Sequence, residues 1–501
     1  MASQHRPNIL VVVLDCVRAS DFWRETSLEE YMPFIASFSR ECVRFPRAVA
    51  PAPWTIPSHA SLFTGLYPWE HGAHMQKENV LSKGVPTIAQ ALRDIGYATL
   101  SVSGNFLVSP FFGLTSGFEY SHWGGWWEPF LRWPLAEAER VRPHDSGPPN
   151  PVLQRMRFGD FSPLFGELKG NLSRHSEIID VLVHLARKVR LPEDEGYPVA
   201  APWIEGDLAQ ALQRVPKEQP TFCFVNLIDA HEPYFSTRTV VKGLGAWLRY
   251  ARQRQDRQGW LEKKWSASED ELKLLHRLYR ESIRSMDQRI RKLIEVLKAS
   301  GRWEDSLVVI TSDHGQAFGE HGTLYHMLDL SEEIVRIPML VKFPKGEYRG
   351  TRCSRWASLV DVAPTVLGEL GEPSRLRTSG FSLKELVDRD RSTPVLTVSD
   401  GLGKLQGASL PPERRMELNQ IQAAAYRGEI KVVVGGGADT KVQVYIVAEP
   451  AAGRSTVWHP NDHERSSLQN FAEMAVKAMG SDDRGSLPIQ VADRLRAWGY
   501  V

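Results

Sequence analysis

The apolar and polar positions of the chain form short, continuous apolar runs bounded by polar residues. Such runs occur at residues 9–14, 98–102, 222–228, 307–310 and 339–341. A strand that is buried on both faces has this pattern, because neither face needs the alternating polar positions of a half-exposed strand. The runs therefore predict the strands of a buried, mostly parallel sheet.

Helical patterns lie between these runs. Residues 87–95 place three apolar side chains on one face and are followed by Gly96. Residues 268–300 repeat apolar side chains at intervals of three or four and are followed by Gly301. Glycine commonly follows the last turn of a helix. Strands and helices that alternate over hundreds of residues predict the α/β class, with helices covering a large mixed, mostly parallel sheet.

One long stretch interrupts this alternation. Residues 123–220 begin with a segment rich in proline, glycine and aromatic residues and continue with helical patterns. We expect this stretch to be an insertion, either a lid or an excursion that faces the substrate. It would belong to a catalytic α/β domain that spans residues 1–392.

The last hundred residues have a different pattern. Short strand-like segments occur at residues 395–398, 429–434 and 442–447, and a helical segment follows at residues 468–479. Short strands close together in sequence are typical of an antiparallel sheet. We therefore predict a small C-terminal α+β subdomain over residues 393–501.

Composition and charge narrow the function classes. The 501 residues include 61 Lys+Arg and 60 Asp+Glu, so the net charge gives no reason to expect a nucleic-acid partner. The apolar run at residues 9–14 is far shorter than the roughly 20 residues of a membrane span, and no other run approaches that length. The 4 cysteines lack the paired spacing of a disulfide framework or thiolate zinc site. We expect a cytoplasmic protein without a membrane span, and no oligomeric state is predicted.

Candidate metal ligands follow three of the predicted strands. These are Asp15, the segment Asp229-Ala230-His231 and the pair Asp313-His314. Ligands of open α/β sheets bind where strands end, and carboxylates with imidazoles suit a divalent cation. A single aspartate after a strand is better explained as a turn former. The two motifs together favour a metal site.

A fourth segment, residues 52–72, carries a candidate nucleophile. Thr55 lies where a short helix is predicted to begin. The positive end of the helix dipole would favour attack by a hydroxyl on an anionic ester. A threonine at this position could equally serve as an N-cap alone.

These segments resemble the alkaline phosphatase superfamily, on its sulfatase-like branch. The resemblance rests on PNILVVVLDCVRASDF, WTIPSHASLFTGLYPWEHGA, ITSDHGQAFGEHG and ASLVDVAPTVLGELG, which follow one another in the family's order between Pro7 and Gly371. It implies an alkaline phosphatase-like fold and a hydrolase of small anionic esters. Sulfatases of this family oxidise a cysteine or serine to formylglycine, but Thr55 occupies that position here and His59 replaces the usual arginine. A secondary alcohol would not give the aldehyde, and threonine is the nucleophile of the family's phosphodiesterases and transferases.

The resemblance also implies roles for individual residues. It assigns to one divalent cation, which could be zinc, manganese, calcium or magnesium, the ligands Asp15, Thr55, Asp313 and His314. A second metal or an anion-binding set would come from Asp229, His231, His326 and Asn105. We favour a single metal, with His231 and His326 binding the anion and protonating the leaving group.

The predicted activity is hydrolysis of a phosphate monoester, phosphate diester or phosphonate ester, with Thr55 as nucleophile. The alternatives are a sulfatase without formylglycine, a phosphotransferase to an acceptor alcohol, and a catalytically silent relative that binds an anion. Tryptophans are abundant, with 15 in the chain. Trp54, Trp126 and Trp127 are candidates for a pocket, which would suit a substrate with an apolar or aromatic portion.

Overall fold

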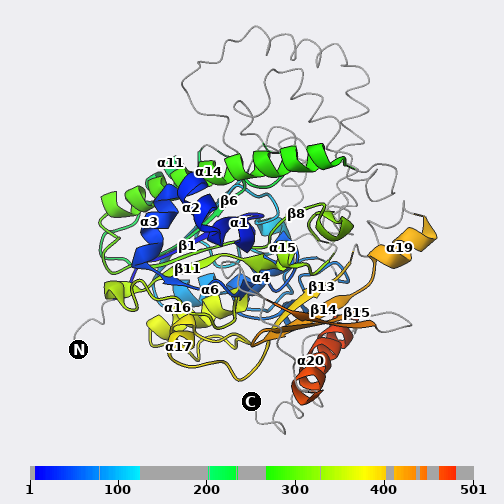
Figure 1. Ribbon diagram of the computed structural model, residues 1–501. Helices are drawn as coiled ribbons and strands as arrows, with labels where there is room; N and C mark the ends of the chain where they lie inside the picture. The colour runs from blue at the N-terminus through cyan, green and yellow to red at the C-terminus, as the bar shows by residue number, and fades with distance from the viewer. Residues whose placement is uncertain are drawn as a thin grey trace, which may run out of the picture.

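The computed structural model describes residues 6–77, 79–124, 201, 203–232, 234, 267–327, 329–401, 411–435, 441–447 and 462–480. Its centre is a seven-stranded sheet flanked by helices on both faces (Figure 1). The strands, in spatial order, are β2 (Val43–Arg44), β11 (Met339–Lys342), β7 (Leu307–Thr311), β1 (Ile9–Leu14), β6 (Thr221–Leu227), β4 (Ala98–Ser103) and β5 (Tyr120–Trp123). Five strands, β7 to β5 in this order, are parallel to one another. Four of them correspond to the predicted apolar runs, and β5 does not.

Strand β11 departs from the expected direction. It pairs antiparallel with β7 on one side and with β2 on the other. A continuous apolar run indicates that a strand is buried on both faces, but it carries no information about direction.

Both faces of the central sheet are buried, which explains the unbroken apolar runs. In β1, Ile9, Val11 and Val13 pack in one apolar core, and the alternate residues pack in the other. The first core includes helices α4 (Thr55–Thr64), α6 (Ile88–Arg93), α16 (Val362–Glu369) and α17 (Leu383–Asp388). The second includes α1 (Ala19–Trp23), α3 (Pro33–Phe38), α11 (Ile204–Gln213) and α14 (Glu269–Ala299).

A separate antiparallel sheet lies near the C-terminus. It contains β13 (Val395–Ser399), β14 (Gln422–Arg427), β15 (Ile430–Gly435) and β16 (Lys441–Ile446). Helix α20 (Asp462–Gly480) packs on β14 and β15 through an apolar cluster that includes Phe471 and Val432. The opposite face of the sheet contacts the main domain, where Tyr426 packs beside Trp356.

The remaining elements are short. Two small sheets contain β3 (Ala48–Val49), β10 (Arg336–Ile337) and β12 (Ala357–Ser358), and β8 (Ala317–Phe318) with β9 (Leu324–Tyr325). The other short helices are α2 (Glu25–Tyr31), α5 (Pro68–His71), α15 (Glu332–Val335) and α19 (Pro412–Leu418). None of the described helices combines the length and the apolar character that crossing a bilayer requires.

The register of the central strands sets the place of the site. Val13 of β1 pairs with Thr311 of β7, so Asp15 and Asp313 leave the sheet at the same level. Leu14 pairs with Leu227 of β6, whose carbonyl also accepts a hydrogen bond from the Asp15 amide at 2.9 Å. The carboxyl ends of three parallel strands therefore meet at one edge of the sheet.

Candidate active site

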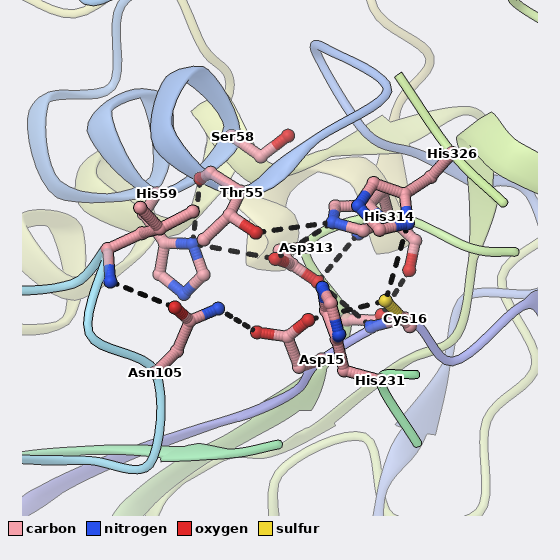
Figure 2. A network of polar contacts seen from close by, with 12 residues as sticks. Asp15, Cys16, Thr55, Ser58, His59, Asn105, His231, Asp313, His314 and His326 are labelled. Atoms are coloured by element: carbon pink, nitrogen blue, oxygen red, sulfur yellow. Dashed lines mark hydrogen bonds and ion pairs between the residues drawn. The ribbon is translucent and has the colours of Figure 1, made fainter. Parts of the chain in front are cut away.

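The predicted metal set lies together at this edge (Figure 2). Asp15 follows β1, Asp313 and His314 follow β7, and Thr55 begins α4. The Thr55 Oγ1 atom lies 3.4 Å from His314 Nε2, and the His314 Nε2 atom lies 3.4 Å from an Asp313 carboxylate oxygen. Residues that are far apart in sequence therefore surround one small space.

Thr55 is the first residue of its helix rather than the N-cap. The N-cap is Trp54, which has an extended backbone and makes no capping hydrogen bond with its side chain. The Thr55 side chain is buried, and its hydroxyl points toward His314 (Figure 2). The interpretation of Thr55 as a simple N-cap is wrong.

Two buried carboxylates face each other across the site. Asp15 accepts hydrogen bonds from the side-chain amides of Asn105 at 2.7 Å and Asn226 at 3.3 Å. Asp313 Oδ1 accepts from the backbone N–H groups of Cys16 at 3.3 Å and His314 at 2.9 Å. Asp313 Oδ2 is buried and has no hydrogen-bond partner, an arrangement that is costly unless a cation is bound there.

The pKa shifts of Asp15 and Asp313 also fit a bound cation. Burial and the negative charge of Asp15 raise the pKa of Asp313 well above its usual range. Burial also opposes ionisation of Asp15, but the charges of His231 and His314 and the hydrogen bond from Asn105 outweigh it, and the pKa of Asp15 is lowered. Two carboxylate oxygens with an imidazole nitrogen and a hydroxyl form a donor set that fits a divalent cation.

A second group of polar side chains lies beside the first. Cys16, His231, Glu232 and His326 each offer a ligand atom, and these atoms lie within 4.8 Å of one another. The His231 and His326 ring centroids are 5.1 Å apart, and those of His326 and His314 are 4.4 Å apart. Both predicted histidines therefore face the site of Thr55.

Gln316 connects this second group to the protein around it. Its side-chain oxygen contacts His326 Nδ1 at 2.8 Å, and its amide donates to Glu232 at 2.8 Å and to Tyr234 at 3.0 Å.

Cys16 is in the left-handed backbone region, with a φ of 64°. A side chain other than glycine adopts this conformation at a cost of about 1–3 kcal/mol, and such strain is concentrated at functional sites.

His59 is a further part of the site to which the sequence assigned no role. Its Nδ1 atom donates to the Thr55 carbonyl at 2.9 Å and lies 3.7 Å from Asp313 Oδ2. Burial lowers the pKa of His59 to about 4, so the ring is neutral near pH 7. The ring thus supplies a hydrogen bond but no positive charge at the position where the resemblance led us to expect an arginine.

Three other residues were also missed. These are Asn226, Glu232 and Gln316. Asn226 had a visible signal, because it is the one amide in the otherwise apolar run at residues 222–228. Glu232 and Gln316 are ordinary polar residues in sequence, and only their contacts with His326 and with each other distinguish them.

Two predicted site residues make different contacts from those expected. Asp229 forms an ion pair with Arg289 at 2.8 Å and accepts from Ser285 at 3.2 Å, so its carboxylate is already engaged outside the histidine group. Asn105 donates one hydrogen bond to Asp15, and its role in binding the anion stays a prediction.

The tryptophan prediction has a mixed outcome. Trp54 is buried in the core, and its indole N–H donates to Asp400 at 3.1 Å. Trp126 and Trp127, with most of the predicted insertion, lie outside the described residues. A pocket built from them stays a prediction.

Comparisons with known proteins agree with the geometry. The sequence model of the sulfatase family matches residues 7–372. The choline-sulfatase of Rhizobium meliloti is 22% identical over 456 residues, which cover 82% of this chain and 80% of that protein. The N-acetylglucosamine-6-O-sulfatase of Bacteroides thetaiotaomicron is 31% identical over 117 residues, so the chain matches 21% of that relative's length. The phosphonate monoester hydrolase of Agrobacterium radiobacter shares the fold, with a TM-score of 0.61 and 17% identity over 95% of this chain and 96% of that one.

Proposed function

This chain belongs to the sulfatase family, and we propose that it is a metal-dependent hydrolase of small phosphate or phosphonate esters with Thr55 as nucleophile. The family and its relatives support a hydrolase of anionic esters. One observation carries the finer proposal. The buried Thr55 hydroxyl lies 3.4 Å from His314, beside an Asp313 oxygen that has no hydrogen-bond partner.

The proposed ligands are Asp15, Thr55, Asp313 and His314. A bound divalent cation would favour the ionised Thr55 hydroxyl and stabilise negative charge on the transferred group. The amides of Asn105 and Asn226 hold Asp15 in place. The neutral His59 ring holds the Thr55 carbonyl. The His59 contact lies within the first turn of α4 and so helps to fix the direction of the Thr55 hydroxyl.

The reaction would proceed in two steps. The Thr55 hydroxyl gives up its proton to solvent, and its oxygen forms a bond to phosphorus while the bond from phosphorus to the leaving alcohol breaks. His231 or His326 gives that alcohol a proton. Water then attacks phosphorus and returns one proton to that histidine, while the bond from phosphorus to the Thr55 oxygen breaks. That oxygen takes up a proton from solvent, which restores the hydroxyl. A threonine cannot become the formylglycine aldehyde, which supports phosphoryl over sulfuryl chemistry.

A panel of substrates tests this proposal. Protein reconstituted separately with zinc, manganese, calcium and magnesium would be assayed on p-nitrophenyl phosphate, a phosphate diester, a phenylphosphonate monoester and p-nitrophenyl sulfate. We expect kcat/KM to be highest for a phosphorus ester. A clear preference for the sulfate would instead support a sulfatase that works without formylglycine. No turnover and no bound metal would support the silent relative.

Metal stoichiometry tests the role of the two histidines. We propose that His231 and His326 bind the anion and protonate the leaving group, so the protein should bind about one equivalent of metal. The group of Cys16, His231, Glu232 and His326 offers the alternative of a second cation. Two equivalents, one of them lost in a His326→Gln variant, would assign the histidines to metal instead.

A further inference from the structure

Residues 51–54 form the loop before Thr55, and hydrogen bonds anchor every one of them. Each of its four residues makes a hydrogen bond to a partner outside the loop. The contacts are Pro51 O with Val398 N (2.9 Å), Ala52 O with Ser58 Oγ (2.9 Å), Pro53 O with Met327 N (2.9 Å) and Trp54 Nε1 with Asp400 Oδ1 (3.1 Å). Two of the four partners, Val398 and Asp400, come from the end of strand β13 in the small C-terminal sheet.

The same strand end also reaches the second group of the site. The Ser399 hydroxyl donates to the carbonyl of Met327 at 3.2 Å, and Met327 follows His326 directly. Residues 398–400 therefore contact both the loop that precedes Thr55 and the loop that carries His326. The small sheet therefore contacts two of the loops that carry residues of the proposed active site.

Asp400 is the polar centre of this junction. It is 2% exposed, and besides Trp54 its carboxylate accepts a hydrogen bond from the backbone N–H of Met75. Its carbonyl accepts from the side chain of Gln76 at 2.6 Å. The carboxylate thus satisfies two donors from different segments, one on each oxygen. An asparagine could accept only one of these hydrogen bonds, because its NH₂ group would face the other donor.

We propose that Asp400 is a positioning residue for Thr55, acting through the indole of Trp54. The inference rests on the proposed function, in which Thr55 is the nucleophile. Trp54 is the N-cap of α4, so its side-chain anchor fixes where the helix begins. Without that anchor the first turn would shift, and a displacement of about 1 Å at a reacting atom costs on the order of 100-fold in rate.

Asp400→Asn and Trp54→Phe test the contact from its two sides. Trp54→Phe removes the Asp400–Trp54 hydrogen bond and keeps an aromatic ring in the core, whereas Asp400→Asn leaves one acceptor oxygen for two donors, Trp54 and Met75. We expect kcat on the best ester of the substrate panel to fall about 10–100-fold, with little change in KM. The double variant should lose less than the product of the two single losses, since both changes act on the Asp400–Trp54 contact.

Glu429→Ala is the matched control. Its carboxylate contacts Arg47 at 3.4 Å across the same junction between the small sheet and the main domain, but at a partly exposed position. This variant should keep the kcat of the wild type. Hydrogen exchange of the amides at residues 54–59 supplies a readout apart from turnover. Exchange should accelerate in Asp400→Asn and Trp54→Phe and stay unchanged in Glu429→Ala.

The outcomes separate the two proposals. If the wild-type protein hydrolyses none of the esters, the proposed function fails before any variant is compared. If it turns over and Trp54→Phe keeps the wild-type kcat, the positioning role is overturned. An equal loss in Glu429→Ala overturns it too, because the loss then reflects general loosening of the small sheet. If Asp400→Asn does not fold, Trp54→Phe decides by the same criteria.

Discussion

Two regions with buried aspartates lie at the same edge of the central sheet and differ in how their charge is balanced. Asp229 follows β6, and Arg289 of α14 holds its carboxylate at 2.8 Å. Asp15 and Asp313 follow β1 and β7, and in the described part of the chain neither forms an ion pair with a lysine or an arginine. Both regions present the same signal in sequence, an aspartate directly after a buried strand.

The difference shows what distinguishes a structural carboxylate from a candidate ligand. A buried charge is tolerated when an opposite charge and hydrogen bonds satisfy it. The Asp229 region meets this condition from within the chain, since Arg289 forms an ion pair with Asp229 at 2.8 Å and Ser285 donates a hydrogen bond to it. The pair of Asp15 and Asp313 does not, and Asp313 Oδ2 has no hydrogen-bond partner. The charge that is missing is the one a divalent cation would bring.

Among the variants of the two regions, removal of the Thr55 hydroxyl, beside Asp313, should lower kcat the most. Thr55→Ala deletes the proposed attacking oxygen and one metal ligand, so we expect kcat to fall by about 10³–10⁴-fold or more. Thr55→Ser is the control, because it keeps an oxygen in the same place and should keep part of the activity. A Thr55→Ala enzyme with nearly unchanged kcat would mean that water attacks directly.

Paired aspartate variants test the comparison itself. Asp313→Asn should lower the amount of bound metal and reduce kcat by at least about 100-fold. Mutation of a residue that hydrogen-bonds to a metal ligand typically costs about 10–100-fold in metal affinity or activity, and loss of a ligand itself should cost no less. Asp229→Asn should keep both metal and kcat. It should instead lower the free energy of unfolding by about 1–3 kcal/mol, because Arg289 loses one ionised partner. Metal analysis, steady-state kinetics and denaturant unfolding of both variants supply the measurements.

The pair of variants can also contradict the interpretation. If Asp229→Asn loses metal as completely as Asp313→Asn while it stays folded, the ion pair with Arg289 does not exclude Asp229 from the metal site. The distinction between the two regions would then be wrong.

A third, smaller expected effect is the loss of stability in acid, and it concerns two buried histidines that are neutral in the folded protein. Burial lowers the pKa of both His71 and His74 to about 3. Below the usual histidine pKa of about 6.5, the unfolded chain therefore binds protons that the folded chain does not. Each of these histidines should lower the free energy of unfolding by about 1.4 kcal/mol per pH unit as the pH falls below about 6.

Chemical unfolding between pH 7 and pH 5 measures this slope. His74→Gln should reduce the slope by the share of one histidine, since glutamine does not titrate. An unchanged slope in that variant would mean that other groups cause the acid sensitivity. In contrast to the region of Asp15 and Asp313, this sensitivity should not depend on added metal.

Much of the fold could be predicted from the chain, because burial on both faces leaves a clear trace. The run at residues 9–14 predicted β1 with its observed bounds. Strand β14 was missed because Gln422–Arg427 contains three alanines in place of the branched and aromatic side chains that mark strands. The direction of β11 depends on the path of the chain, which an apolar run does not record.

The site was predictable where residues follow strands and less so where distant segments meet. Asp15, Asp313 and His314 were found from their positions at strand ends. The engagement of Asp229 depends on Arg289, which lies 60 residues further along the chain in helix α14. Asp400 and Gln316 have no local signal at all, and their roles arise from contacts that only the folded chain makes.

The smallest expected effect concerns how His326 is held. Gln316 contacts His326 Nδ1 through its oxygen and Glu232 through its amide, so Gln316→Leu should free the ring to turn. We expect kcat to fall about 10-fold, with a shifted basic limb in its pH profile if His326 protonates the leaving group. Tyr234→Phe is the matched control, because it removes only the phenol that accepts from Gln316 and leaves His326 in place.

Because protonation matters little for a good leaving group, the loss of kcat in Gln316→Leu should be larger for an alkyl ester than for a p-nitrophenyl ester. Equal losses on both esters would remove His326 from the proton transfer and leave it a role in binding the anion.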